Sequence, residues 1–258
     1  MTPSYPFLFF SNAPHLARGV GSFVFWGTCY HSFIPMRALK SLALSLVSLV
    51  LVAFPVHAAE TIHAFDVSAE LKADRTLTVT ETITYDFGDE FRHGIYRTIP
   101  ETYDRNGARY KLRLHVLDVT MDGQAIPWTA SRSNGQLSVR IGDKDKTITS
   151  RHVYSLRYET NRAVNTFPEG DEWYWNVTGN DWEVPIERAQ LQFVGPAAPS
   201  DVTCFTGSFG SRESLCTITQ EGGQVFIEAT RPFQAYEGLT VAVRLPPGSV
   251  AALTTGQR

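Results

Sequence analysis

Residues 77–87 alternate between two kinds of side chain at every second position. Apolar residues occupy all the odd positions except one, Glu81, and threonine occupies five successive even positions from 76 to 84. A period of two places alternate side chains on opposite faces of a β-strand. The segment therefore predicts a strand with one buried face and one threonine face, in which Glu81 points into the core.

The same pattern recurs along the chain at short spacing. Residues 65–71 alternate likewise and residues 73–75 supply a turn, which predicts an opening hairpin. Further strands are predicted at residues 112–119, 126–130, 137–141, 153–160, 172–177, 189–194, 202–205, 225–229 and 239–245. Between apolar runs lie three dipeptides that tolerate the positive φ of tight hairpin turns: Asp122-Gly123, Asn134-Gly135 and Gly222-Gly223.

No segment after residue 59 carries a convincing 3.6-residue apolar period with caps, so little helix is expected. Many short strands in about 200 residues predict an all-β fold, an antiparallel β-sandwich of immunoglobulin-like or related type with long loops. The longest segments without a strand pattern are residues 88–110 and 161–172. Long loops on a rigid sheet are where binding residues usually lie.

A positively charged stub and an apolar stretch precede the strands. Met36-Arg37-Ala38-Leu39-Lys40 leads into an apolar run at 42–54, which is too short to span a bilayer and ends in Val56-His57-Ala58. We interpret residues 36–58 as a secretory signal, and residues 1–35 as an over-extended reading frame or a disordered, membrane-associated leader. Residues 59–246 are then an extracytoplasmic domain, in the periplasm or on the outer side of the cell membrane, and residues 247–258 a linker or tail.

Charge and cysteine usage narrow the possible partners. Three of the 23 basic residues lie before residue 59, whereas all 26 acidic residues follow it, which leaves a net charge of −6. A net acidic domain without a basic stripe is a poor candidate for binding nucleic acid or anionic lipid headgroups. Cys29 lies in the leader, so Cys204 and Cys216 are predicted to form a disulfide in an oxidising compartment.

Three blocks of sequence resemble a known family. They are Phe-Arg-His-Gly-Ile-Tyr-Arg-Thr-Ile-Pro at 91–100, Glu-Trp-Tyr-Trp-Asn-Val-Thr-Gly-Asn-Asp-Trp at 172–182 and Glu-Gly-Leu-Thr-Val at 237–241. With the threonine strand, Cys204-Phe205-Thr206-Gly207 and Arg231-Pro232, they resemble the bacterial "domain of unknown function 2207" family of predicted membrane proteins. The resemblance implies a signal peptide, an extracytoplasmic β-rich domain and then membrane helices, but no activity. This chain stops at Arg258, where such a helix would be due, so it is either a truncated reading frame or a member secreted free.

Aromatic side chains supply the candidate binding residues. Stacked sugar rings or peptides often dock on Trp and Tyr faces, which makes the block at 172–182 a possible platform. Trp173 and Trp175 share one strand face and are expected to fill the core. The candidates for binding are therefore Tyr174 and Trp182, together with two residues of the 88–110 segment, His93 and Tyr96.

The sequence predicts no catalytic residue, no metal site and no cofactor. His93 lies near Asp89 and Glu90, but no nucleophile stands at a readable spacing, and residues 142–146 are only a fragment of a calcium loop. We predict a non-catalytic domain that binds or senses a ligand of the envelope, or assembles with an envelope protein, the partner being a protein or a glycan. The alternative is a glycan-acting enzyme or transfer factor that uses residues 88–110 and the region of Trp182.

Glu81 needs a partner if it is buried. An unpaired buried carboxylate costs several kcal/mol, so the fold must supply a cation or keep the group protonated. Arg97 is the predicted partner in a structural ion pair, because it follows the strand closely and can grip a carboxylate with two parallel bonds. Arg92 or water could serve instead, and an edge bulge could turn Glu81 outward.

Overall fold

The computed structural model describes residues 59–105 and 108–253. The predicted leader at 1–35, the predicted signal at 36–58 with Cys29 before it, and the end of the predicted tail lie outside the described residues. The described part is built from β-strands, which confirms the predicted all-β fold. Within it, no helix is long and apolar enough to cross a membrane.

The largest sheet has eight strands in the order β15-β16-β13-β1-β2-β10-β6-β7. Their bounds, in that order, are Cys216–Glu221, Gln224–Ala229, Ala189–Val194, Thr61–Leu71, Leu77–Asp86, Arg151–Thr160, His115–Met121 and Gln124–Ala125. β1 and β2 form the predicted opening hairpin. β1 and β13 run parallel, however, and this pair is an exception to the predicted antiparallel arrangement.

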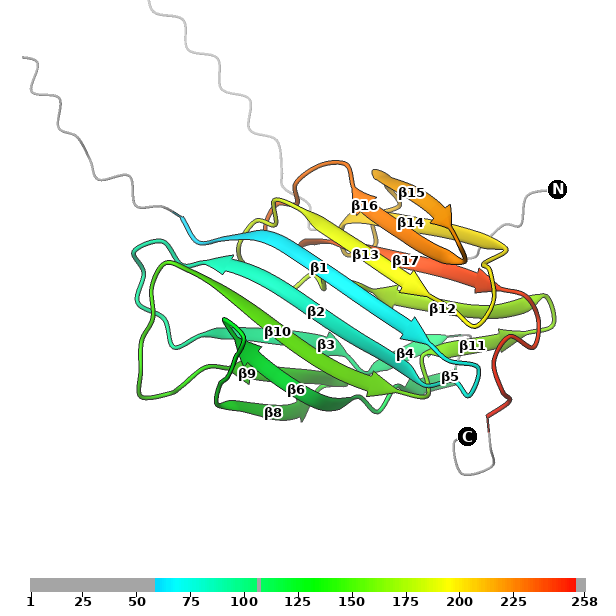
Figure 1. The fold of residues 1–258 in the computed structure, drawn as a ribbon, viewed down its shortest axis with the longest axis horizontal. Coiled ribbons are helices and arrows are strands. Elements are labelled where there is room, and N and C mark those ends of the chain that lie inside the picture. Colours follow the sequence, from blue (N-terminus) through cyan, green and yellow to red (C-terminus); the bar gives the residue numbers. More distant parts are fainter. Residues whose placement is uncertain (1–58, 106–107, 254–258) are drawn as a thin grey trace, which may run out of the picture. The chain divides into compact units, whose positions relative to one another are not determined.

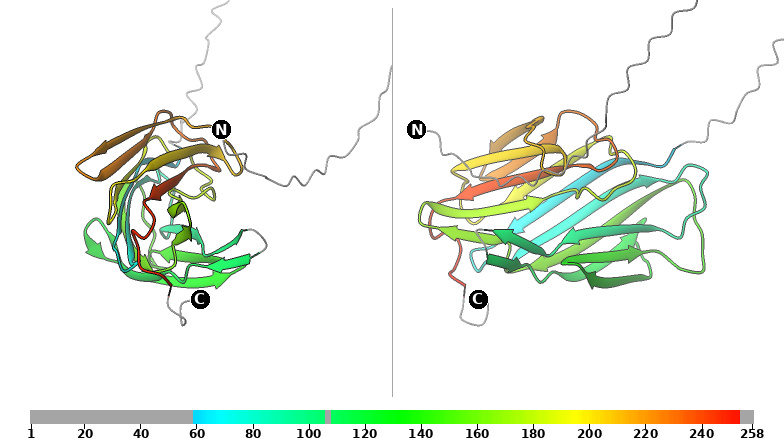
Figure 2. Two further views of the ribbon diagram at one scale, coloured as in Figure 1. Left: turned by 90° about the vertical axis from the view of Figure 1, so that its right-hand side faces the viewer. Right: turned by 180° about the vertical axis from the view of Figure 1, so that it is seen from behind.

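Three smaller sheets complete the fold (Figures 1 and 2). The four-stranded sheet has the order β11-β12-β17-β14, with bounds Val164–Phe167, Gly170–Asn176, Glu237–Leu245 and Asp201–Ser208. The three-stranded sheet has the order β3-β9-β8, with bounds Ile95–Pro100, Gln136–Ile141 and Trp128–Ser133. A hairpin joins β4 (Thr102–Arg105) to β5 (Ala108–Lys111).

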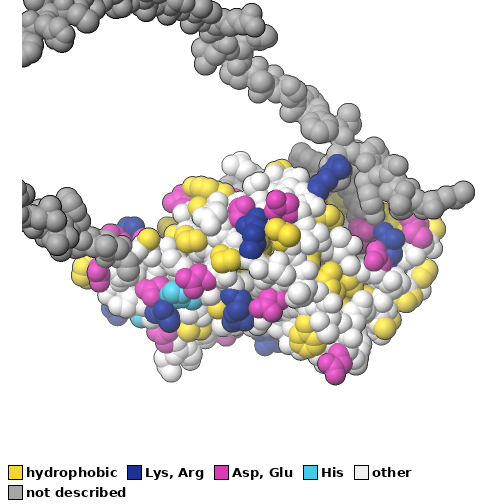
Figure 3. Space-filling model, turned by 90° about the horizontal axis from the view of Figure 1, so that it is seen from above, with side chains coloured by type: hydrophobic (Ala, Val, Ile, Leu, Met, Phe, Trp, Pro, Cys, Tyr) yellow, Lys and Arg dark blue, Asp and Glu magenta, His cyan; other side chains and the backbone are white. Residues whose placement is uncertain are grey.

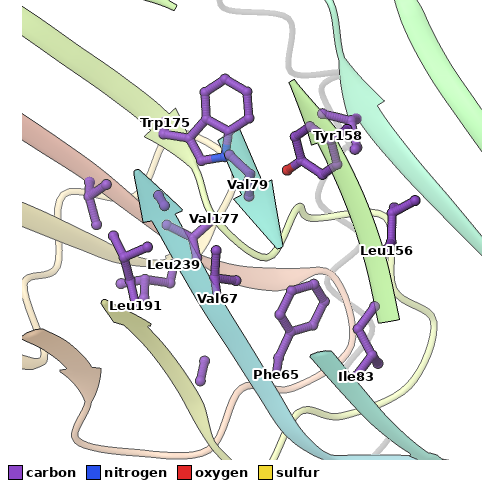
Figure 4. Packing of buried hydrophobic residues seen from close by; sticks show 14 of the residues in the cluster. Phe65, Val67, Val79, Ile83, Leu156, Tyr158, Trp175, Val177, Leu191 and Leu239 are labelled. Carbon is purple, nitrogen blue, oxygen red and sulfur yellow. The ribbon is translucent and has the colours of Figure 1, made fainter. Parts of the chain in front are cut away.

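Aromatic side chains fill the space between the largest sheet and the four-stranded sheet. Trp173 stacks on Phe193 with ring centroids 4.7 Å apart, and Trp175 stacks on Tyr158 at 6.3 Å. Both tryptophans are fully buried, as their position on the same strand face predicted. Figure 4 shows Trp175 and Tyr158 among the apolar residues that the two sheets contribute to this core.

The three dipeptides predicted to form turns do so. Asp122-Gly123, Asn134-Gly135 and Gly222-Gly223 all have positive φ at both residues. They connect β6 to β7, β8 to β9 and β15 to β16. Two central residues with positive φ give the turn type whose twist matches that of a hairpin.

Both segments without a predicted strand pattern contain strands. β3, β4 and β5 lie within 88–110 or next to it, and β11 and the start of β12 lie within 161–172. In β3 the inward positions are Ile95, Arg97 and Ile99, so an arginine interrupts the apolar alternation. β15 was also missed, because almost all of its residues are exposed and no buried face marks it.

The last described residues are bound to the domain. The backbone N–H of Ala251 donates to the carbonyl of Ala73 at 2.7 Å, and that of Val250 donates to Asp171 Oδ2 at 3.1 Å. Arg75, which is buried, donates from Nη1 to the carbonyl of Ala251 at 3.0 Å. The start of the predicted tail is therefore held beside the turn between β1 and β2 (Figure 1).

Candidate binding groove

Glu81 and Arg97 form a buried ion pair between two sheets. Arg97 Nε donates to Glu81 Oε2 at 2.7 Å and Arg97 Nη2 to Glu81 Oε1 at 2.8 Å, which is the two-bond geometry that the guanidinium favours. The hydroxyl of Tyr158 donates to Glu81 Oε1 at 2.7 Å. Glu81 and Arg97 are 0% and 1% exposed, so neither charge is balanced by water.

Arg97 also binds the loop that follows β12. Its Nη2 donates to the carbonyl of Val177 at 3.1 Å, its Nη1 donates to the carbonyl of Thr98 at 2.8 Å, and its guanidinium lies 5.4 Å from the centre of the Phe65 ring. Burial opposes the charged guanidinium, but the adjacent Glu81 carboxylate outweighs it and raises the pKa of Arg97. Arg97 is thus a structural residue that joins three sheets.

Trp182 is buried, which corrects the expectation that it lies on the surface. Its ring packs against Phe65 and Tyr85, with centroids at 5.9 and 6.4 Å, and its Nε1 donates to the carbonyl of Thr178 at 2.8 Å. The remaining exposure is 7%. An indole needs only one acceptor for its N–H, and the preceding loop supplies it within the core.

The other three candidate binding residues are exposed, and they come from two strands and a loop. Tyr96 is 63% exposed on β3 and Tyr174 is 43% exposed on β12. His93 lies in the loop before β3, where its Nδ1 is 2.8 Å from the carbonyl oxygen of Lys146. Trp182, being buried, is not among these exposed side chains.

Cys204 and Cys216 are joined by a disulfide. Cys204 belongs to β14 of the four-stranded sheet and Cys216 to β15 at the edge of the largest sheet. The bond therefore links the two layers at one edge. Nearby, Arg231 lies between Glu237 and Glu213, with Nη1 to Oε2 of Glu237 at 2.6 Å and Nη2 to Oε2 of Glu213 at 3.1 Å.

A groove of about 370 Å³ opens on the outer face of the largest sheet. Five adjacent strands, from β15 to β2, contribute side chains to it in two rows. One row contains Thr219, Phe226, Gln192, Ser68 and Thr80, and the other contains Thr217, Glu228, Gln190, Asp66 and Thr82. Neither Tyr96 nor Tyr174 nor His93 lies in this groove.

The polar groups of the groove are only partly satisfied by the protein. Gln192 Nε2 donates to Gln224 Oε1 at 3.0 Å, and Arg188 Nη2 donates to Asp66 Oδ2 at 3.0 Å. Asp66 Oδ1 is shielded from solvent and has no donor among the described residues. A buried acceptor without a donor is costly, which makes Asp66 the side chain of this groove with most to gain from a ligand.

The sequence predicts one wall of the groove but not the groove itself. The threonine face of residues 76–84 was predicted, and two of its members line the site. The opposite wall comes from β13, β15 and β16, which lie more than a hundred residues later in the chain. The outward residues of these strands line the groove only because β13 pairs in parallel with β1. No local sequence pattern predicts that pairing.

The surface around the domain carries charges of both signs. Figure 3, which views the molecule from above, shows basic, acidic and histidine side chains interspersed with uncharged ones on the visible face. Opposite charges close together cancel at a distance, so this face offers no single-sign field to a polyelectrolyte.

Comparisons with known proteins agree with the resemblance seen in the sequence. Residues 61–245 match the family described as the N-terminal domain of predicted membrane proteins (DUF2207). The uncharacterized protein YciQ of Escherichia coli (strain K12) is 32% identical over 194 residues, which is 72% of this chain and 30% of that protein. The chain thus spans less than a third of the length of this relative.

Solved structures offer only a weak likeness. Native leukotriene A4 hydrolase from Saccharomyces cerevisiae aligns with 72% of this chain and 29% of its own, at 10% identity and a TM-score of 0.48. The M1 zinc metallopeptidase from Deinococcus radiodurans aligns with 70% of this chain and 42% of its own, at 13% identity and a TM-score of 0.40. At these scores the likeness carries no functional argument. The chain belongs to the DUF2207 family of predicted membrane proteins, as the match over residues 61–245 establishes.

Proposed function

We propose that the domain is a non-catalytic binding module on the extracytoplasmic side of the membrane, and that the groove of the largest sheet holds a hydroxyl-bearing glycan of the envelope. The supporting observation is the composition of the groove, in which hydroxyl, amide and carboxylate groups from five strands face one open volume. Small-molecule and glycan sites combine an apolar surface with a few convergent polar groups of this kind.

The donors and acceptors of the groove suit a sugar. Threonine, serine and glutamine side chains both donate and accept hydrogen bonds, as sugar hydroxyls do. Phe226 is 41% exposed and offers a ring face to the apolar side of a sugar. The negative charges of Asp66 and Glu228 disfavour the binding of an anionic polymer.

An extended peptide fits the groove less well. Peptides that bind sheets usually add a strand at an edge, where backbone N–H and C=O groups are free. Here the backbone groups of β1, β2 and β13 are already paired with neighbours on both sides. Only side chains remain available in the middle of the sheet, and those are mainly hydroxyls and amides.

Isothermal titration calorimetry on the full chain with a soluble oligomer of N-acetylglucosamine tests the proposal. We expect measurable binding, weakened about tenfold or more by Gln190→Ala and by Phe226→Ala. Thr240→Ala is the matched control, because Thr240 lies on the outer face of the four-stranded sheet. The proposal fails if the folded wild-type chain does not bind the oligomer, or if the groove variants behave like the control.

A further inference from the structure

A second groove, of about 290 Å³, lies at the end of the largest sheet where β2 and β6 begin and β10 ends. It shares no residue with the first groove, on the outer face of the largest sheet, which is called the hydroxyl-lined groove below. Its walls combine three basic side chains with one acid and three neutral polar residues: Arg113, His115 and Arg162, then Glu159, then Thr76, Thr160 and Asn161. A concentration of basic groups in one concavity is unusual in a domain with a net negative charge.

The backbone that carries Arg113 is held in place from both sides. The N–H of Leu112 donates to the carbonyl of Glu101 at 2.8 Å, and the N–H of Leu114 donates to the carboxylate of the same residue at 2.8 Å. Both leucines are buried, and Arg113 between them has φ 57. A left-handed conformation is unfavourable for a residue other than glycine, and here it directs the arginine outward.

Thr160 ties the segments of the two arginines together. Its side chain is almost fully buried, its hydroxyl donates to the carbonyl of Leu112, and its oxygen accepts from the backbone N–H of Arg162 at 3.2 Å. The hydroxyl therefore fixes the residue before Arg113 and the residue Arg162 itself to one point. The backbone positions from which the two arginine side chains extend are therefore set by buried structure.

In the described part of the chain, neither guanidinium has a partner. Among the residues that the structure describes, no carboxylate lies within ion-pair distance of the side chains of Arg113 or Arg162, and neither side chain donates a hydrogen bond. Glu159 lines the same groove but pairs with neither of them. Burial first, and the charge of Arg113 second, lower the pKa of Arg162. Two like charges without a counter-charge are relieved by an anion.

We infer that Arg113, Arg162 and His115 form a binding site for a phosphate-type oxyanion. The planar fork of an arginine matches the oxygens of phosphate with two parallel bonds, and two arginines can grip one group from two sides. His115, Asn161 and Thr76 add further N–H or O–H donors. Glu159 weakens the site without cancelling it, since it sets one negative charge against two guanidinium charges.

The position of the groove suggests two sources of the anion. Thr76 follows the turn at Ala73, to which Ala251 is hydrogen-bonded, so the groove lies near the point where the described chain ends. In this family the domain is the N-terminal part of predicted membrane proteins, whose chains continue from this end. A lipid headgroup and free phosphate share the chemistry that the site recognises, although net charge alone had argued against the headgroup.

Two assays on the full chain separate the sources. Calorimetry with inorganic phosphate tests the free anion, and co-sedimentation with vesicles of phosphatidylglycerol, against phosphatidylcholine, tests the headgroup. We expect Arg113→Gln and Arg162→Gln each to weaken binding about tenfold or more. Arg140→Gln, which removes the same charge from β9 outside the groove, should leave binding unchanged. Glu159→Gln should strengthen binding several-fold, a gain that a poorly folded variant would not give.

The possible results decide the inference. Binding of phosphate alone, or of the anionic vesicles as well, supports the site if it depends on both arginines, and the responding probe identifies the source. Binding to anionic vesicles only, with the same dependence, supports a headgroup site. The inference is overturned if the wild-type chain binds neither probe, or if Arg140→Gln weakens binding as much as the groove variants do. Since the hydroxyl-lined groove is not involved, its own test is independent of these results.

Discussion

A single acidic residue at an inward position is the most informative residue of the chain. Glu81 shares its strand face with Leu77, Val79 and Ile83, and the structure buries it with them. A carboxylate at that depth requires a cation and further donors, which Arg97 and Tyr158 provide. The alternation of inward and outward side chains along one strand could therefore predict a contact between two sheets.

The pair can be measured by a double-mutant cycle. Glu81→Gln and Arg97→Met should each reduce the free energy of unfolding by about 3–5 kcal/mol, because each leaves its partner buried and stranded. The double variant should lose much less than the sum of the two. Urea denaturation followed by circular dichroism gives these values.

An exposed pair provides the control for this cycle. Arg188 and Asp66 are 3.0 Å apart, but their side chains are 43% and 30% exposed. Arg188→Met should therefore cost only about 0–1 kcal/mol. Strictly additive losses at Glu81 and Arg97 would show that the two side chains do not act as a pair.

The alternation of side chains along a strand cannot predict the burial or the direction of the remaining site residues. Trp182 follows no alternation, so its side could not be read from the sequence, and burial was decided by its packing on Phe65 and Tyr85. Arg113 gave no signal at all, because its outward direction depends on hydrogen bonds that the backbone N–H groups of Leu112 and Leu114 donate to Glu101, on another part of the chain. Local sequence patterns cannot predict the positions of residues that tertiary contacts determine.

At the scale of elements, strands were recognised where one face is buried and uniform. β13 was predicted with its correct bounds, and β2 and β9 nearly so, since their inward positions are mostly apolar. β3 was missed because Arg97 occupies an inward position, and β15 because it has no buried face. Periodicity in the sequence thus fails to predict an edge strand without a buried face and a strand with a charged residue at an inward position.

The loop after β12 is an element shaped by close approach to Arg97. Gly179 has φ 79, and a methyl group added to it would lie 2.5 Å from Arg97 Nη1. Gly123 has nearly the same φ, 74, with nothing within 4 Å. Replacing either with alanine carries a similar backbone cost of about 1–2 kcal/mol.

Gly179→Ala should therefore destabilise the protein more than Gly123→Ala. The added crowding against a buried guanidinium is expected to cost a further 1–3 kcal/mol or so, as overpacking of a core does. Thermal denaturation of the two variants gives the comparison directly. Equal melting temperatures would mean that Arg97 moves aside freely and does not fix this loop.

At the scale of the whole molecule, a covalent link between two sheets stabilises the fold. The disulfide of Cys204 and Cys216 joins the four-stranded sheet to an otherwise open edge of the largest sheet. Its 12-residue separation closes a short loop, for which the chain-entropy model gives a stabilisation of roughly 3 kcal/mol. Disulfides form and persist mainly in oxidising compartments, so the bond is consistent with the predicted export.

Reduction of the disulfide should lower the free energy of unfolding by roughly 3 kcal/mol. A variant with both Cys204→Ala and Cys216→Ala should be less stable by a similar amount and insensitive to reductant. Mass measurements after alkylation, with and without reduction, report the state of the two thiols. Two freely alkylated thiols in exported protein without reductant would refute the bond and weaken the case for export.

The parallel pairing of β1 with β13 also governs the order in which the molecule can fold. β1 and β2 are neighbours in the chain and can associate early, whereas the other edge of β1 must wait for Ala189–Val194. Loop closure over such a long separation is slow. A chain delivered from its N-terminus would therefore expose one unpaired edge of its future central strand until most of the domain had emerged, and during that interval it is open to aggregation and to capture by chaperones.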